Sequence, residues 1–127
     1  MTQDEQVQYL ANVCFLARSD SDYDIEEDSL LLEIAKSIGA GYLETRKGLD
    51  MAMADGFRIK FPARFSDQVR NLEDLMLMSI WDSRLHEMEK KIVYSYAKQL
   101  GLGKKQFDII KKQAKSRFKG MKAEDKR

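Results

Sequence analysis

The chain has 127 residues, of which 43% are hydrophobic and 34% charged, with a formal net charge of +1. This length suffices for one domain that buries a core without a metal or disulfide, and the composition excludes a disordered chain. The sequence contains no run of about eighteen apolar residues, and its acidic start is unlike a signal peptide, so we expect a cytoplasmic protein that does not span a membrane.

Apolar residues spaced three and four apart predict three helices in the first half, over about 3–18, 25–38 and 42–54. Thr2 and Glu5 are typical of a capping box, and Gly39 is expected to end the second helix. After the third helix, aromatic and aliphatic residues alternate with basic ones up to Pro62, which predicts an extended connector. A strap over the gap between the halves is the favoured interpretation, ahead of a peptide or nucleic-acid contact.

The second half predicts the same order of elements. Ser66 is a plausible N-cap for a helix that runs towards Trp81, and a loop at about 82–86 leads to a helix that closes before Gly101. A last helix is expected over roughly 104–118. Residues 119–127 contain few apolar side chains, so we expect a flexible basic tail there.

The two halves also share residues at a constant offset of 62 positions. The matching pairs are Gln6/Gln68, Val7/Val69, Leu10/Leu72, Asp20/Asp82, Ser21/Ser83, Glu27/Glu89, Ala35/Ala97, Lys36/Lys98, Gly39/Gly101 and Gly41/Gly103. The sequence therefore predicts an all-α compact bundle of about six helices, built as two pseudo-symmetric three-helix repeats. Residues 1–118 would form a single domain, with repeat one at about 3–54, a connector at 55–65 and repeat two at about 66–118.

Several of these residues resemble the signature of the TerB-like family, known from tellurium-resistance proteins and the N-terminal domain of the co-chaperone DjlA. The resemblance covers roughly residues 6–115. It rests on the string Asn71-Leu72-Glu73-Asp74-Leu75-Met76, then Asp82, Glu89 and Tyr96-Ala97-Lys98-Gln99-Leu100-Gly101-Leu102, and on similar spacing in the first half. It implies an all-α, non-enzymatic module of bacterial stress-response assemblies near the inner membrane, which has protein partners and binds metal through acidic loops. Ser21 and Ser83 stand where the family has glycine, which weakens the metal analogy.

The acidic loops are the candidate metal sites. Oxygen ligands at alternating positions suit calcium, magnesium or manganese. The candidate ligands are Asp20, Asp22, Asp24, Glu27, Asp82 and Glu89. An EF-hand is rejected, because Ile25 takes the place of the turn glycine and Leu31 that of the closing glutamate. The alternative is that these acids stabilise the positive N-terminal ends of the following helices.

Other motifs are weaker. His86 is a single histidine without cysteine partners and falls short of a zinc set, and Trp81 is expected in the core. Cys14 is expected to be a buried packing residue. The sequence shows no convincing catalytic triad or nucleophile, so we expect no enzymatic activity.

The charge is distributed asymmetrically. Residues 1–33 carry nine acids and one base, whereas residues 103–127 carry ten bases and three acids. The basic end is a candidate partner-binding surface, with Lys104, Lys105, Lys111, Lys112, Lys115 and Arg117 as its residues. A second-choice function is the binding of nucleic acid or another anionic surface through this end. The alternative is a solvated lysine face that keeps the protein soluble.

Overall fold

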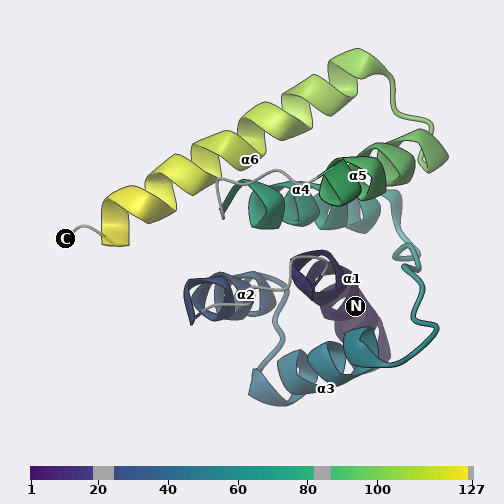
Figure 1. Cartoon of the computed structure of the whole chain (residues 1–127), viewed down its shortest axis with the longest axis vertical. Helices are drawn as coiled ribbons and strands as arrows, with labels where there is room; N and C mark the ends of the chain where they lie inside the picture. The colour runs from purple at the N-terminus through teal and green to yellow at the C-terminus, as the bar shows by residue number, and fades with distance from the viewer. Residues whose placement is uncertain (19–24, 82–86, 126–127) are drawn as a thin grey trace.

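The computed structural model describes residues 1–18, 25–81 and 87–125; the side chains of residues 17–18, 25–28, 81, 87–89 and 122–125 lie outside this description. The described residues form helices and no strands, which confirms the all-α prediction. The helices are α1 (Gln3–Arg18), α2 (Ile25–Ser37), α3 (Tyr42–Met53), α4 (Phe65–Trp81), α5 (Glu87–Gln99) and α6 (Lys104–Asp125). Helices α1–α3 occupy one side of the molecule and α4–α6 the other (Figure 1). None of these helices combines the length and the apolar character needed to cross a membrane, as far as the described residues go.

The joints after α2 and α5 have the same local structure. Gly39 and Gly101 have φ angles of 78° and 76°, in the left-handed region that glycine adopts without a steric penalty. In each joint the residue after the glycine donates its N–H to a carbonyl five residues earlier, over 2.8 and 3.1 Å. This is a Schellman motif, which ends a helix and satisfies its last carbonyls. The prediction that these glycines end helices is confirmed.

A second pair of matching contacts lies at the starts of α3 and α6, the helices that follow these joints. Gly41 donates its N–H to the Glu44 side chain over 3.5 Å, and Gly103 donates to the Gln106 side chain over 2.6 Å. A side chain at this position satisfies an N–H group that the helix leaves without a partner. At the start of α1 the roles of backbone and side chain are exchanged: the Thr2 side chain accepts, through Oγ1, a hydrogen bond from the Glu5 backbone N–H over 3.2 Å.

The helix starts follow the sequence repeat. Each helix of the second half begins 62 residues after its counterpart: α1 at Gln3 and α4 at Phe65, α2 at Ile25 and α5 at Glu87, α3 at Tyr42 and α6 at Lys104.

Two predicted boundaries were wrong. Helix α4 begins at Phe65, so Ser66 lies inside the first turn instead of capping it. Helix α6 continues to Asp125, beyond the predicted end near residue 118. Phe118 and Met121 pack against the core cluster, and packing of an apolar face supports helix better than propensity alone. The flexibility of residues 119–127 stays a prediction.

Helices α1 and α3 approach each other closely at Gly48. This glycine is buried, and a Cβ atom built on it would lie 3.0 Å from Leu10 Cβ and 3.1 Å from both Ala11 N and Val7 O. Gly48 is therefore the point where α3 rests on the backbone of α1. Cys14 is fully buried in the same core, as predicted.

The segment between α3 and α4 packs along the core. The ring of Phe57 lies 5.3 Å from that of Phe15 on α1, and the ring of Phe61 lies 4.5 Å from that of Tyr96 on α5. Asn12 on α1 holds the backbone between them, because its Nδ2 donates to the Lys60 carbonyl over 2.9 Å. The connector thus bridges the two sides of the molecule.

A buried hydrogen-bonded cluster joins α1 to α4. The Tyr9 hydroxyl donates to Asp74 Oδ2, Asn12 Nδ2 donates to Asn71 Oδ1 over 2.9 Å, and Asn71 Nδ2 donates to the Tyr9 carbonyl over 3.3 Å. The Tyr96 hydroxyl adds a hydrogen bond to Asn71 Oδ1 over 3.0 Å. Such pairing removes the cost of burying polar groups and fixes how the two sides meet.

Candidate functional site

The predicted metal ligands lie outside the part of the structure that can be described. Asp20, Asp22, Asp24 and Asp82 belong to the undescribed segments, as does His86. Glu27 and Glu89 lie in the first turns of α2 and α5, but their side chains are not described, and the same is true of Trp81. The described residues contain no group of three acidic, histidine or cysteine side chains that could hold a metal ion. The cation site in the acidic loops therefore stays a prediction.

The predicted basic surface lies along α6. Lys104, Lys105, Lys112 and Lys115 are exposed and Lys111 is half-buried; we call these five lysines the basic face. From Lys104 to Met121 the helix carries seven basic residues and one acid, Asp108. Ile109, which is 57% exposed, adds an apolar side chain to this helix.

Arg117 differs from the five lysines, because it contacts α4. Its Nη1 atom lies 2.7 Å from Asp74 Oδ1 and 3.1 Å from Glu73 Oε2. The guanidinium is 30% exposed, whereas the Asp74 carboxylate is fully buried. Arg117 was predicted as a partner-binding residue; the structure shows that its charge is already compensated by two carboxylates of α4.

The surroundings of this ion pair shift the pKa values of its members. Burial raises the pKa of Asp74 above its usual value, although the hydrogen bond from Tyr9 and the charge of Arg117 oppose the shift. Burial also raises the pKa of the Tyr9 hydroxyl, and the neighbouring Asp74 adds to this. Burial acts to lower the pKa of Arg117, but the charges of Asp74 and Glu73 outweigh it and the pKa lies above its usual value. These groups hold α6 against the rest of the fold.

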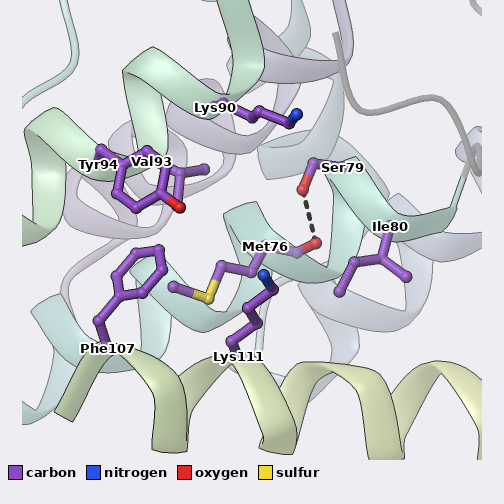
Figure 2. A pocket seen from close by; sticks show the side chains of 8 residues that line it. All are labelled: Met76, Ser79, Ile80, Lys90, Val93, Tyr94, Phe107 and Lys111. Atoms are coloured by element: carbon purple, nitrogen blue, oxygen red, sulfur yellow. Dashed lines mark hydrogen bonds between the residues drawn. The ribbon is translucent and has the colours of Figure 1, made fainter. Parts of the chain in front are cut away.

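A pocket opens between α4, α5 and α6, close to the basic face (Figure 2). Its volume is about 60 Å³. The lining residues are Met76, Ser79 and Ile80 of α4, Lys90, Val93 and Tyr94 of α5, and Phe107 and Lys111 of α6. We call this the α4–α5–α6 pocket.

The walls of the pocket are mainly apolar. The rings of Tyr94 and Phe107 are stacked, with centroids 4.8 Å apart and an angle of 18° between their planes. The thioether of Met76 points towards the space between Phe107 and Lys111 (Figure 2). Methionine and aromatic surfaces accept aliphatic side chains of varied shape. A space of this size suits one such side chain better than a whole small-molecule substrate.

The polar groups of the pocket are two lysines and one serine. Ser79 Oγ donates a hydrogen bond to the Met76 carbonyl over 2.8 Å, so its hydroxyl is engaged within α4. Lys90 and Lys111 enter from opposite sides (Figure 2), and no acidic residue lines the pocket within the described residues. The arrangement can bind an apolar group that has a negative charge beside it.

Lys111 was predicted to lie on a binding surface, but the pocket itself was not predicted. Its walls come from three helices, and spacing within one helix does not show which of its neighbours it faces. The one available signal was a pair of aromatic residues on successive predicted helices, Tyr94 and Phe107.

Comparisons with known proteins gave no relative: no family model, no curated protein and no solved structure matches this chain.

Proposed function

We propose that this chain is a non-enzymatic interaction module that binds an acidic, partly apolar surface of a partner protein through the α4–α5–α6 pocket and the basic face. The observation that carries the proposal is an apolar pocket with a lysine on either side, next to a helix on which basic residues outnumber acidic ones. An apolar anchor in a desolvated pocket supplies affinity, and complementary charge around it supplies orientation and a fast association rate.

We also propose that the two halves form the two-fold repeat of a TerB-like module. At the offset of 62 residues, Tyr9 corresponds to Asn71 and Asn12 to Asp74. The Tyr9–Asp74 and Asn12–Asn71 hydrogen bonds therefore exchange with each other when the halves are swapped. Reciprocal contacts of this kind are what a two-fold axis generates. The matching helix starts and the two Schellman motifs support the same relation.

In this proposal the module belongs to a cytoplasmic stress-response assembly, as the family resemblance implies, and its acidic loops bind a divalent cation. Titration calorimetry with calcium, magnesium, manganese and zinc tests the cation part. We expect heat of binding that is lost in the Asp20→Ala/Glu27→Ala variant. Absence of heat at millimolar cation, or heat that the variant leaves unchanged, would remove cation binding and leave the pocket proposal standing.

The pocket proposal is tested with a labelled synthetic peptide that is rich in Asp and Glu and carries one central leucine. We expect the Lys111→Glu/Lys112→Glu variant to weaken binding by about tenfold or more, because it reverses two charges of the basic face. Lys47→Glu/Lys60→Glu makes the same change in net charge at exposed sites elsewhere and should have a much smaller effect. Replacing the leucine by glycine should also weaken binding.

If the two double variants weakened peptide binding equally, net charge alone would explain the binding, and the proposed surface would be refuted. The alternative function, binding of nucleic acid, predicts instead that duplex DNA binds more tightly than the peptide, with an affinity that falls steeply as salt rises.

A further inference from the structure

A second cavity lies on another part of the molecule, between the connector and α5. Its volume is about 390 Å³, within the range typical of small-molecule sites. It is lined by Phe15 of α1, by connector residues from Phe57 to Phe61, and by one side of α5 from Lys91 to Gln99. We call it the connector groove.

The groove is held open by contacts within the fold. The Phe15–Phe57 and Phe61–Tyr96 ring pairs fix the connector at two points, with centroid distances of 5.3 and 4.5 Å. Between these points, Asn12 binds the Lys60 carbonyl over 2.9 Å and accepts the Lys60 N–H over 3.4 Å. Preformed walls lower the entropy cost of binding a ligand.

The interior of the groove suits an aliphatic chain. Ile59 and Ile92 are half-buried and line it, together with the edges of the paired rings. Phe57 and Phe61 are half-buried and tilted against their partner rings, at 44° and 53°. Nucleic-acid bases require open, flat aromatic faces for stacking, and these rings are already engaged.

The charge around the groove has one sign. Arg58 and Lys91 line it and are exposed, and no acidic residue lines it within the described part of the chain. No ion pair joins either cation to another described residue. The other polar side chains that line the groove are already hydrogen-bonded: Ser95 and Gln99 to each other over 3.0 Å, and the Tyr96 hydroxyl to Asn71 Oδ1 over 3.0 Å. Two cations beside apolar surface attract a ligand that carries a negative head group on a hydrocarbon body.

We propose that the connector groove binds an anionic amphipathic small molecule: an alkyl chain of medium length ending in a carboxylate. The chain lies against Ile59 and Ile92, and the carboxylate accepts hydrogen bonds from the Arg58 guanidinium and the Lys91 ammonium. This site is independent of the α4–α5–α6 pocket, since the two share no lining residue.

The test is titration of the full chain with octanoate, followed by calorimetry and by amide chemical shifts in ¹⁵N-labelled protein. We expect saturable binding, with the shifts concentrated in the connector and α5. Octanamide keeps the chain and lacks the charge, and butanoate keeps the charge and lacks most of the chain. Each should bind about tenfold more weakly or worse, because each loses one of the two interactions.

The matched variants are Arg58→Gln/Lys91→Gln, which removes both cations, and Lys111→Gln/Lys112→Gln, which removes two cations from the basic face. We expect the first to weaken octanoate binding by about tenfold or more and the second to leave it within about twofold. The side chains replaced in both variants are exposed or half-buried, so we expect both variants to fold, which circular dichroism checks.

The proposal is overturned by absence of saturable octanoate binding, by equal affinity for octanamide, or by shifts that map elsewhere on the molecule. Single-stranded RNA that competes at the connector more strongly than octanoate would assign the groove to nucleic acid instead. None of these results bears on acidic-peptide binding at the basic face, which has its own variants.

Discussion

Replacing Gly48 by alanine tests the close approach of α3 to α1. In an exposed helix, such a change stabilises by roughly 1 kcal/mol, because glycine loses more backbone entropy on folding. At Gly48 the new Cβ would lie 3.0–3.1 Å from Leu10 Cβ and from two backbone atoms of α1. Backbone atoms cannot rotate away, so α3 must move by a few tenths of an ångström.

Overpacking of this kind costs about 1–3 kcal/mol, which exceeds the gain in propensity. We therefore expect the free energy of unfolding of Gly48→Ala to fall by about 1 kcal/mol, and that of Gly48→Val to fall further, because valine adds two methyl groups at the same contact. Urea denaturation followed by circular dichroism at 222 nm measures both.

Gly120→Ala is the matched control. Gly120 is also helical, but it is exposed, and apart from its own stretch of helix no atom lies within 4 Å of the position of its added Cβ. This variant should be as stable as the original chain or up to about 1 kcal/mol more stable. If Gly48→Ala were stabilised as much as Gly120→Ala, the helices would not be in backbone contact and the reasoning would fail.

Three further predictions concern the buried cluster. The pKa of Asp74 is raised in the folded protein above its ordinary value of 3.8, so its contribution to stability is full below that value and declines as pH rises through the folded pKa; the free energy of unfolding of the original chain minus that of Asp74→Asn should therefore fall as pH rises from that ordinary value in denaturant titrations, and a rising difference would contradict the shift. Arg117→Met leaves a buried carboxylate without its cation and should cost about 3 kcal/mol; in a double-mutant cycle, adding Asp74→Asn should recover part of this loss, whereas strict additivity would show that the pair does not interact. Asn12→Asp replaces the buried Nδ2 donor that binds the Lys60 carbonyl and Asn71 Oδ1 by a charged oxygen, so it should lower the free energy of unfolding more than Asn12→Ala does at pH 7, by a difference that narrows as pH falls; a difference that stays constant with pH would show that the new carboxyl is solvated.

Several helix ends were predicted correctly from local sequence. Gly39 and Gly101 indicated where α2 and α5 end, because glycine is the residue that adopts the left-handed conformation readily. Local chemistry also predicted the Thr2 cap and the non-helical segment before α4. The errors at Ser66 and at the end of α6 have a different origin. The end of α6 depends on the packing of Phe118 and Met121 against the core, which local sequence does not encode. The start of α4 is set within the helix itself, because the Gln68 N–H already donates to the Arg64 carbonyl over 2.9 Å.

The buried polar cluster could not be predicted from periodicity. Asn71 and Asp74 interrupt the apolar side of α4, and a polar residue there is compatible with exposure, with capping or with a buried partner. Its partners Tyr9 and Asn12 lie about sixty residues away in the sequence, so only the meeting of α1 and α4 identifies them. The available signal was the offset of 62 residues, which maps the Tyr9–Asp74 pair onto the Asn71–Asn12 pair.

The reciprocal hydrogen bonds between α1 and α4 have a consequence for valency. On the proposed two-fold relation, two separate copies of one half would pair at the same positions as a homodimer, with Tyr9 of each copy against Asn12 of the other, and that dimer would present two identical binding surfaces. Joining the halves in one chain releases them from identity: Gly48 corresponds to Ile110, and Asp55 corresponds to Arg117. The lining residues of the α4–α5–α6 pocket all belong to the second half, so on the proposed function one chain would occupy one site on a partner and would not cross-link two.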